Sequence, residues 1–298
     1  MIKPDWIAVD WGTSRLRAWA MAQSSEMLER CDSDDGMSGL SPQDFEPALL
    51  RLIEPWLGQT RLDVLCCGMV GARQGWIEAP YVAVPCPVEP AALTEAPVSD
   101  HRISVRIAPG VKQADPADVM RGEETQIAGL LLDRPEFDGV VCLPGTHSKW
   151  VHVSAGEIVS FRTFMTGELF GFLADQSVLR HSVGDGWDDD AFVEAVADAI
   201  SKPEMIAARL FSLRAESLLG GLAGATARAR LSGLLIGVEL AAARPYWLGR
   251  DVAIIGAGSL AAAYNAALSA QGVAPSVETG GDMALKGLVA LRNAMAPA

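Results

Sequence analysis

Short apolar runs alternate with helical spacing from the start of this chain. Runs typical of strands occupy Ile7–Val9, Leu16–Met21 and Met27–Cys31. Apolar residues over Phe45–Trp56 then follow helical spacing, and Leu62–Cys67 is an apolar strand that ends at a glycine. Three strands, a helix and a further strand form the opening pattern of an α/β domain.

A strand over Ile103–Ala108 and a helix over Ala117–Leu132 are predicted next, and Asp133-Arg134-Pro135 breaks that helix. The stretch from Gly75 to Pro97 is rich in proline and small residues, which predicts an irregular excursion. After the break the same pattern restarts, with three strands and a helix at Val140–Leu143, Lys149–Val153, Ile158–Thr163 and Gly167–Leu179. The remaining chain predicts helices to Arg244, then strand, helix, strand and helix at Val252–Ile255, Leu260–Ala270, Pro275–Glu278 and Met283–Met295.

The two runs align with each other. A shift of 133 positions places Gly12-Thr13 on Gly145-Thr146, and each pair ends a predicted strand before two further strands and a helix. A shared turn within two matching runs indicates an internal duplication. We therefore expect two similar α/β domains, 1–135 and 136–298, with a cleft between them.

Charge and cysteine content exclude some classes of partner. The 298 residues carry a net charge of −13, which argues against nucleic acid or an anionic membrane. The five cysteines form no C-x-x-C pair, so we expect reduced thiols in a cytoplasmic protein. The start MIKPDW lacks the apolar core of a signal peptide, and glycine and proline interrupt the uncharged run 252–277.

Two Gly-Thr turns suit phosphate binding, because glycine admits close backbone N–H groups and threonine adds a hydroxyl donor. Asp10 stands just before the first turn, and Mg²⁺ takes few protein oxygens while it bridges phosphates. Asp10 is therefore the candidate metal carboxylate, although an aspartate here also suits a simple turn.

A glycine-rich turn opens the predicted helix in IIGAGSLAAAYNAAL, 254–268. This pattern fits part of a dinucleotide-binding fingerprint, but no convincing β-α-β unit with an acidic residue follows it. A turn of this kind equally accepts an adenosine or its α-phosphate.

Phosphoryl transfer to an alcohol needs a carboxylate that takes the hydroxyl proton. Glu123 and Glu124 stand near a predicted helix start in VMRGEETQIAGL, and Glu168 opens another helix as a rival base. The alternative is a charged first turn stabilised by the helix dipole.

Six motifs extend this picture: DWGTSRLRAW, CGMVGARQGW with the following APY, VMRGEETQ, LPGTHSKWV, FRTFMTGEL and LSGLLIGVE. Together they resemble the 2-dehydro-3-deoxygalactonokinase family and run from Asp10 to Glu239. The resemblance implies two ribonuclease-H-like domains of the actin, hexokinase and Hsp70 ATPase superfamily, which bind ATP and Mg²⁺ in the cleft. It also implies transfer of the γ-phosphate to the 6-hydroxyl of 2-dehydro-3-deoxy-D-galactonate, in galactonate catabolism.

The resemblance assigns roles to individual residues. Leu143-Pro144 departs from the superfamily, many members of which place a second aspartate there, so the metal role rests on Asp10. Glu124 is the preferred base, ahead of Glu123 and Glu168. The nucleotide is expected at Gly12, Thr13, Ser14, Gly145, Thr146, His147, Gly256, Gly258 and Asp282. The substrate is expected at Arg15, Met69, Arg73, Trp76, Lys149, Arg162 and Thr166, and the cations among these are candidates for its carboxylate.

Two other activities stay open: a kinase for the gluconate epimer, and a phosphohydrolase of the same fold. An ATP-driven scaffold is disfavoured, because no stretch is left over for extra domains or assembly surfaces. The partner is a small molecule, and the sequence does not decide whether the chain forms a homodimer.

Overall fold

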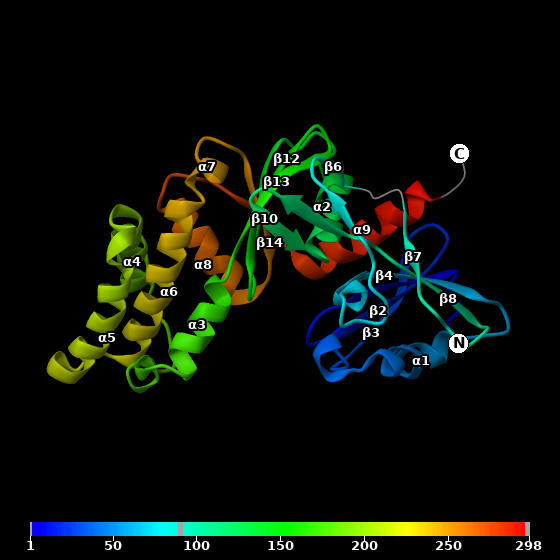
Figure 1. The fold of residues 1–298 in the computed structure, drawn as a ribbon, viewed down its shortest axis with the longest axis horizontal. Helices are drawn as coiled ribbons and strands as arrows, with labels where there is room; N and C mark the ends of the chain where they lie inside the picture. The colour runs from blue at the N-terminus through cyan, green and yellow to red at the C-terminus, as the bar shows by residue number, and fades with distance from the viewer. Residues whose placement is uncertain (1, 89–91, 296–298) are drawn as a thin grey trace. The chain divides into compact units, whose positions relative to one another are not determined.

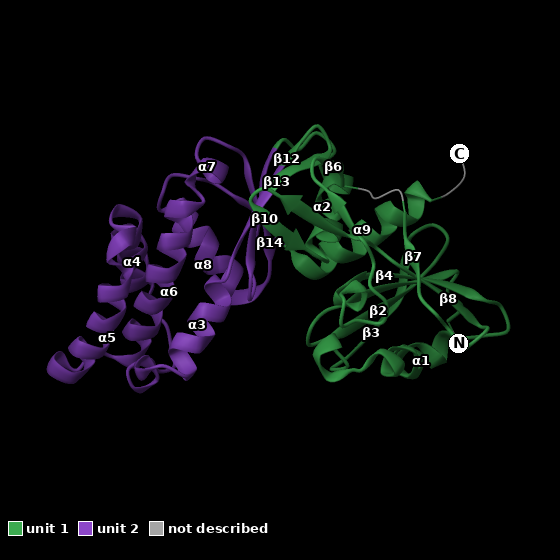
Figure 2. Cartoon of the chain, viewed as in Figure 1, with its two compact units in different colours: residues 1–138, 153–160, 279–298 green, residues 139–152, 161–278 purple. Residues whose placement is uncertain are grey.

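The computed structural model describes residues 2–88 and 92–295, and the chain divides into two compact units (Figure 2). Unit 1 comprises Met1–Asp138, Val153–Ser160 and Thr279–Ala298, and unit 2 comprises Gly139–His152 and Phe161–Glu278. The expected boundary at residue 135 differs from this division, because two later segments pack with the N-terminal part. No helix among the described residues is both long and apolar enough to cross a membrane.

Unit 1 is built on a six-stranded sheet of order β3-β2-β1-β4-β8-β7 (Figure 1). Strands β1 and β4 are parallel, as are β4 and β8, whereas β2 is antiparallel to both β1 and β3. The strand bounds are β1 Trp6–Trp11, β2 Leu16–Met21, β3 Met27–Ser33, β4 Leu62–Gly68, β7 Thr94–Glu95 and β8 Ile103–Ile107.

Both faces of the centre of this sheet are covered, which is why β1, β2 and β4 are almost continuously buried, whereas β3 is largely exposed. Ile7 and Val9 of β1 pack in a cluster with helix α1, Phe45–Ile53. Trp6 and Ala8 point to the other face, where they pack in a cluster with residues of helix α9, Gly280–Ala294. The final helix thus supplies part of the core of the N-terminal unit.

Helix α9 also packs closely on α2, Glu123–Asp133 (Figure 1). A Cβ at Gly129 of α2 would lie 2.0 Å from the Met283 carbonyl oxygen, and a Cβ at Gly287 of α9 would lie 1.8 Å from that of Thr125. Glycine at both positions lets the two backbones touch. This contact explains why 279–298 groups with unit 1.

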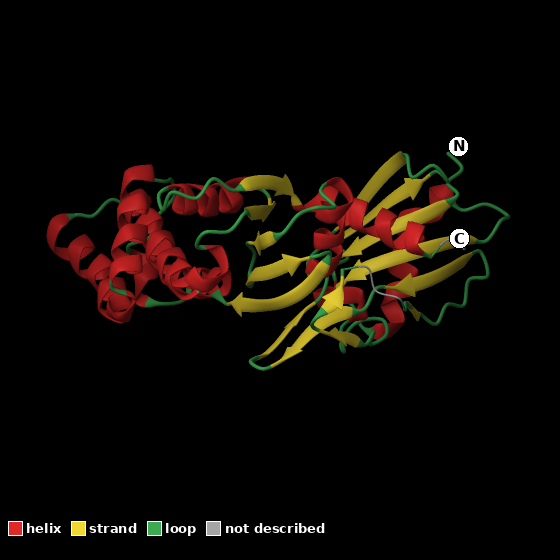
Figure 3. Ribbon diagram, turned by 90° about the horizontal axis from the view of Figure 1, so that it is seen from above, coloured by secondary structure: helices red, strands yellow, loops and turns green. Residues whose placement is uncertain are grey.

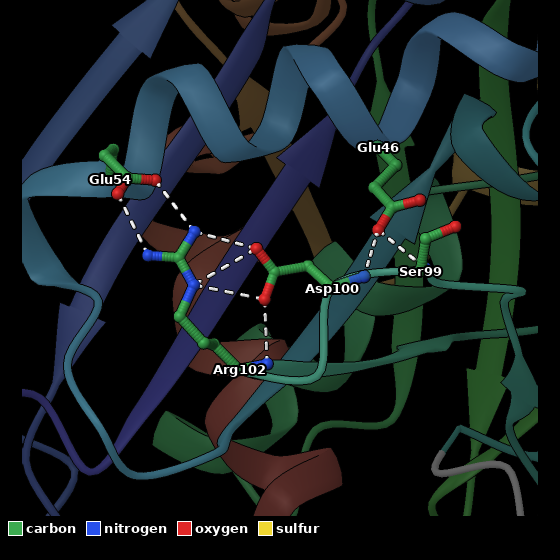
Figure 4. A network of polar contacts seen from close by, with 5 residues as sticks. All are labelled: Glu46, Glu54, Ser99, Asp100 and Arg102. Atoms are coloured by element: carbon green, nitrogen blue, oxygen red, sulfur yellow. Dashed lines mark hydrogen bonds and ion pairs between the residues drawn. The ribbon is translucent and has the colours of Figure 1, made fainter.

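A polar network fixes the segment that leads into β8 (Figure 4). Glu46 of α1 accepts the backbone N–H groups of Ser99 and Asp100 at 2.7 and 2.8 Å. Arg102 donates to Glu54 at 2.9 Å and to Asp100 at 2.7 Å, and the bonds that Asp100 accepts from Arg102 lower the Asp100 pKa to about 2. Loop and helix are therefore held together on the surface of unit 1.

A second six-stranded sheet has the order β15-β14-β11-β12-β13-β6, and β11 and β14 pair in parallel. Its strands are β6 Cys86–Pro87, β11 Gly139–Leu143, β12 Ser148–Ser154, β13 Glu157–Phe164, β14 Val252–Gly256 and β15 Ser276–Thr279. The order β13-β12-β11-β14-β15 repeats β3-β2-β1-β4-β8. The repeated order supports the internal duplication, and the predicted α/β class is confirmed.

Unit 2 adds many helices to its part of this sheet (Figure 3). Their bounds are α3 Thr166–Asp175, α4 Asp189–Ser201, α5 Ile206–Gly220, α6 Gly224–Ala242, α7 Arg244–Trp247 and α8 Gly258–Ser269. Val140, Cys142 and Trp150 of the sheet pack with Ile236 of α6 and Tyr264 of α8.

The expected helix Ala117–Leu132 is wrong in its first part. Ala117–Met120 forms strand β10, which pairs with β9, Gly110–Ala114, in a small sheet that β5, Tyr81–Ala83, completes. This pairing overrides local helical preference, and the helix begins only at Glu123 after Gly122, whose φ is 102°.

Candidate active site

The first Gly-Thr turn joins β1 to β2 and is exposed. The Gly12 N–H donates to the Arg15 carbonyl at 2.8 Å and closes the turn. A neighbouring loop holds it from the side: Ser38 donates from its N–H and its hydroxyl to the Thr13 carbonyl at 3.0 and 2.9 Å. A Cβ at Gly36 would lie 2.3 Å from Ser14, so only glycine fits there.

Asp10 lies on β1 just before this turn, with its side chain 14 % exposed. Arg17 of β2 donates to Asp10 Oδ2 at 2.9 Å. Burial raises the Asp10 pKa, Arg17 opposes this rise, and the negative charge of Glu123 adds to it. Asp10 and Glu123 therefore share one electrostatic environment, although they are far apart in sequence.

Glu123 and Glu124 begin α2, and both carboxylates turn back onto the chain before the helix. The Arg121 N–H donates to Glu123 at 2.9 Å, and the Gly122 N–H donates to the two oxygens of Glu124 at 2.9 and 2.7 Å. Glu124 is only 2 % exposed, and burial, followed by the charge of Glu123, raises its pKa to about 8. It is thus a buried acid that titrates near neutral pH.

Arg121, which the sequence reasoning did not select, joins two of the motifs that carry the resemblance. Its Nη2 donates to the Ala79 carbonyl at 2.7 Å, its guanidinium lies 4.4 Å from the Tyr81 ring centroid, and a Cβ at Gly71 would approach its Nη1. Nε and Nη1 have no hydrogen-bond partner in the described part of the chain. Arg121 thereby ties the segment 71–81 to the start of α2. Its place inside VMRGEETQ was the available signal.

The second Gly-Thr turn, between β11 and β12, packs against the start of α3. A Cβ at Gly167 would lie 2.2 Å from the Gly145 carbonyl oxygen, and the Glu168 N–H donates to the Thr146 carbonyl at 2.9 Å. His147 Nε2 lies 2.6 Å from a carboxylate oxygen of Glu168, and both side chains are about half exposed. Glu168, the rival base, therefore lies beside the second turn.

A cavity of about 650 Å³ lies within unit 2 and includes Gly145 and Thr146 of the second turn in its lining. A site for a drug-sized ligand typically measures about 300–1,000 Å³. Helices α3, α4, α6 and α8 supply most of the other walls, and the aromatic residues of the lining are Phe170, Phe192 and Tyr264 on these helices and Trp187 just before α4. Sequence reasoning missed these residues, because they come from segments that are far apart in the sequence.

The predicted glycines of the adenosine turn border this cavity. Gly256 ends β14, where a Cβ would lie 3.2 Å from Ala261, and Gly258 begins α8 with a φ of 60°. Ser259 and Leu260, the next residues, line the cavity. Asp282 lies instead in the first turn of α9 in unit 1, where it accepts a hydrogen bond from the Thr279 hydroxyl.

The predicted substrate residues are scattered. Arg15 forms exposed ion pairs with Asp32 and Asp34, Arg73 one with Glu78, and Met69 is half-buried. Trp76 packs in the core of unit 1 against Trp11 and Phe45. In unit 2, Lys149 is buried on β12, Arg162 is exposed on β13, and Thr166 lines the cavity.

Comparison with known proteins adds a further finding. A family model described as 2-keto-3-deoxy-galactonokinase matches residues 10–291. A relative from Rhizobium meliloti (strain 1021), named "Probable 2-dehydro-3-deoxygalactonokinase DgoK1", is 38 % identical over 297 residues, with 97 % of each chain covered. The 2-dehydro-3-deoxygalactonokinase of Escherichia coli (strain K12) is 34 % identical over 98 % of each chain.

Solved structures agree with these matches. A crystal structure described as "a putative 2-dehydro-3-deoxygalactonokinase protein from Sinorhizobium meliloti" superposes with a TM-score of 0.89 at 38 % identity, covering 98 % of this chain and 97 % of that one. Component A of the (R)-2-hydroxyglutaryl-CoA dehydratase of Acidaminococcus fermentans has a TM-score of 0.53 at 15 % identity, covering 98 % and 99 %. The second likeness concerns the fold alone.

Proposed function

Since the chain belongs to the 2-keto-3-deoxy-galactonokinase family, we propose that it transfers the γ-phosphate of ATP to the 6-hydroxyl of 2-dehydro-3-deoxy-D-galactonate. It is a sugar-acid kinase, a phosphotransferase with an alcohol group as acceptor. The product is the 6-phosphate of the sugar acid, formed in galactonate catabolism.

The cavity of unit 2 is the observation that supports the nucleotide half of this proposal. Its aromatic walls suit the flat face of an adenine, and Arg228, which lies 5.3 Å from the Phe170 ring centroid, adds a cation to its lining. The Gly145-Thr146 turn offers donors to phosphate oxygens in the same cavity. We assign the adenosine to this cavity and the phosphates to its Gly-Thr end.

Glu124 is the proposed general base. A base works best when its pKa lies near the working pH, and burial has brought this carboxyl to about 8. In its ionised form it accepts the proton of the 6-hydroxyl as that oxygen attacks the γ-phosphorus. Glu123 raises the pKa of Glu124, so it helps to tune the base even if it never receives the proton.

Unit 1 offers few protein ligands to a magnesium ion. Among the described residues, no group of three or more His, Cys, Asp or Glu side chains is arranged to hold a metal. Mg²⁺ needs no such cage, because it takes one or two carboxylates and completes its shell with water and phosphate oxygens. Asp10, with Glu123 in its electrostatic environment, would hold it. Bound there, the ion would neutralise charge on the phosphates.

The substrate carboxylate lies at the opposite end of the six-carbon chain from the 6-hydroxyl, and it requires a cation of its own. Arg15 and Arg73 are candidates in the same unit, because their side chains are 60 % and 80 % exposed and their ion pairs are 3.6 Å or longer. Exposed pairs of this kind are weak, about 0–1 kcal/mol, so a substrate can displace them. Replacing each arginine with methionine should show which one raises the KM for the sugar acid.

One assay tests the activity itself. ADP release is measured with 2-dehydro-3-deoxygalactonate, with its gluconate epimer and with no acceptor. Stimulation by the galactonate form is the expected result, and release without acceptor at the same rate would indicate a phosphohydrolase instead.

The nucleotide cavity is tested by filling it. Ala262 is an exposed residue of α8 that lines the cavity, and Ala262→Trp should raise the KM for ATP by at least about tenfold. Ala270 is exposed at the end of the same helix outside the cavity lining, and Ala270→Trp should leave that KM unchanged. Equal effects of both variants on the KM for ATP would refute the assignment of the nucleotide to this cavity.

We also propose that the protein acts in the cytoplasm, where ATP is available. All five cysteines lie in the described residues and are free thiols, which suits a reducing compartment. Sedimentation of the purified chain would decide between a monomer and a homodimer.

A further inference from the structure

A carboxylate is buried inside unit 2 among neutral hydrogen-bond donors. Glu239 of α6 is 2 % exposed. The Trp150 indole N–H donates to Oε1 at 2.7 Å, and the Tyr264 hydroxyl donates to Oε2 at 2.8 Å. Interactions with the hydroxyls of Thr166 and Ser148 also lower the pKa of this carboxylate.

These donors come from separate parts of the unit. Ser148 and Trp150 are on β12, Thr166 is the first residue of α3, and Tyr264 is on α8. Ser148 and Tyr264 are also linked directly, with their hydroxyl oxygens 2.7 Å apart. An ionised carboxylate has about four acceptor positions, so one side chain can join all of these elements.

The joined elements surround the second Gly-Thr turn. Ser148 follows the turn by two residues, and Thr166 precedes Gly167, the glycine whose backbone packs on the Gly145 carbonyl. Thr166 and Tyr264 themselves line the cavity. Both flanks of the turn and one wall of the cavity therefore depend on the same carboxylate.

We propose that Glu239 is a positioning residue for the nucleotide: it fixes the Gly145-Thr146 turn and the α8 wall of the cavity in the geometry that binds ATP. The inference rests on the proposed nucleotide site. It also gives a role to the LSGLLIGVE motif, which neither the proposed base nor the metal carboxylate uses. Glu239 lies beneath the cavity lining and is absent from it, so it acts through its donors.

The test separates positioning from general stability with two matched tryptophans of unit 2. Trp150→Phe removes the indole donor to Glu239, whereas Trp247→Phe removes an equally buried indole donor that bonds the Leu240 carbonyl at 2.9 Å. Both variants should lose similar thermal stability. Only Trp150→Phe should raise the KM for ATP, by about three- to tenfold, with the sugar-acid KM changed less than about twofold.

Replacing the carboxylate should have a larger effect. Glu239→Leu removes the acceptor of the Trp150 indole and of the Tyr264 hydroxyl, and should raise the KM for ATP and the Kd for Mg-ADP by at least about tenfold. Glu239→Gln keeps one acceptor oxygen, and hydroxyl donors can turn to accept from its amide, so it should recover part of the loss. If Glu239→Leu does not fold, Trp150→Phe and Tyr264→Phe still test the same links.

The failures can be told apart. If Ala262→Trp weakens nucleotide binding but Trp150→Phe, Tyr264→Phe and Glu239→Gln do not, the cavity holds the nucleotide and the positioning role of Glu239 is refuted. If Ala262→Trp has no effect either, the nucleotide site itself is misplaced. Equal increases in both KM values would also overturn the inference, because they indicate general damage.

Discussion

Replacing Glu124 with glutamine should lower kcat by about 10² or more, and it should raise the stability of the folded protein relative to wild type as pH increases. Burial raises the Glu124 pKa from 4.5 to about 8. Between these two values the folded state keeps a proton that the unfolded chain has released. Because the folded state binds more protons there, the free energy of unfolding decreases as pH rises through this window.

The magnitude follows from the width of the window. Each pH unit over which the two states differ by one proton changes the free energy of unfolding by about 1.4 kcal/mol. Between pH 5 and pH 8 the wild-type chain should lose on the order of 4 kcal/mol through Glu124 alone. Glu124→Gln removes this titration, so its stability relative to wild type should rise by that amount over the same range. The glutamine amide is paired imperfectly, which lowers the free energy of unfolding by the same amount at every pH. This loss therefore cancels when the difference between variant and wild type is compared across pH values.

Urea unfolding at several pH values from 5 to 9 measures the effect. Glu123→Gln is the matched control, because it removes the adjacent charge but keeps the buried carboxyl, and it should retain most of the wild-type pH dependence. The same Glu124→Gln protein should bind ATP normally and lose kcat by about 10² or more. A stability difference that does not change with pH would refute the buried acid, and nearly normal kcat would refute its role as base.

Three other substitutions test the proposed metal carboxylate, the rival base and the contact between helices α2 and α9. Asp10→Asn still accepts a hydrogen bond from Arg17 but loses the negative charge, so the Mg²⁺ concentration needed for half-maximal activity should rise about 10- to 100-fold. An unchanged Mg²⁺ titration would exclude Asp10 as a metal ligand. Glu168→Gln breaks the exposed pair with His147 and should change the KM for ATP by less than about tenfold, with kcat nearly unchanged. A large loss of kcat in this variant would indicate that Glu168, and not Glu124, is the base. Gly287→Ala forces a Cβ into the α2 backbone and should lower the free energy of unfolding, measured in urea, by about 1–3 kcal/mol or more. Gly281→Ala is the control on the same helix: its Cβ would meet nothing within 4 Å, so the free energy of unfolding should stay nearly unchanged.

Local signals explain which parts of the structure could be predicted. The strands that lead into Gly12 and Gly145 are short apolar runs that a turn ends, so neighbouring residues in the chain determine them. The segment Ala117–Met120 has no such local signal, because its pairing with β9 decides its conformation. The packing of α9 in unit 1 likewise depends on a glycine contact between helices far apart in the sequence.

The candidate site divides in the same way. Asp10, Glu124 and the Gly-Thr turns stand in motifs that can be read along the chain. The cavity walls cannot, since Phe170 of α3, Trp187 just before α4 and Tyr264 of α8 approach one another only when these segments pack. Trp76 differs from these: its motif predicts a substrate contact, which stays a prediction, and its indole packs in the core of unit 1.

Glu124 and Glu239 are both almost fully buried, yet their surroundings suit opposite tasks. Burial raises the pKa of each. Donors from four side chains oppose the rise at Glu239 and favour its ionised form, so it suits a fixed acceptor that orders its neighbours. At Glu124 the charge of Glu123 adds to the rise and backbone N–H groups oppose it, so this carboxyl titrates near neutral pH and can both take up and release a proton. Glutamine at the first position should therefore abolish turnover and spare nucleotide binding, and glutamine at the second should weaken nucleotide binding and spare kcat.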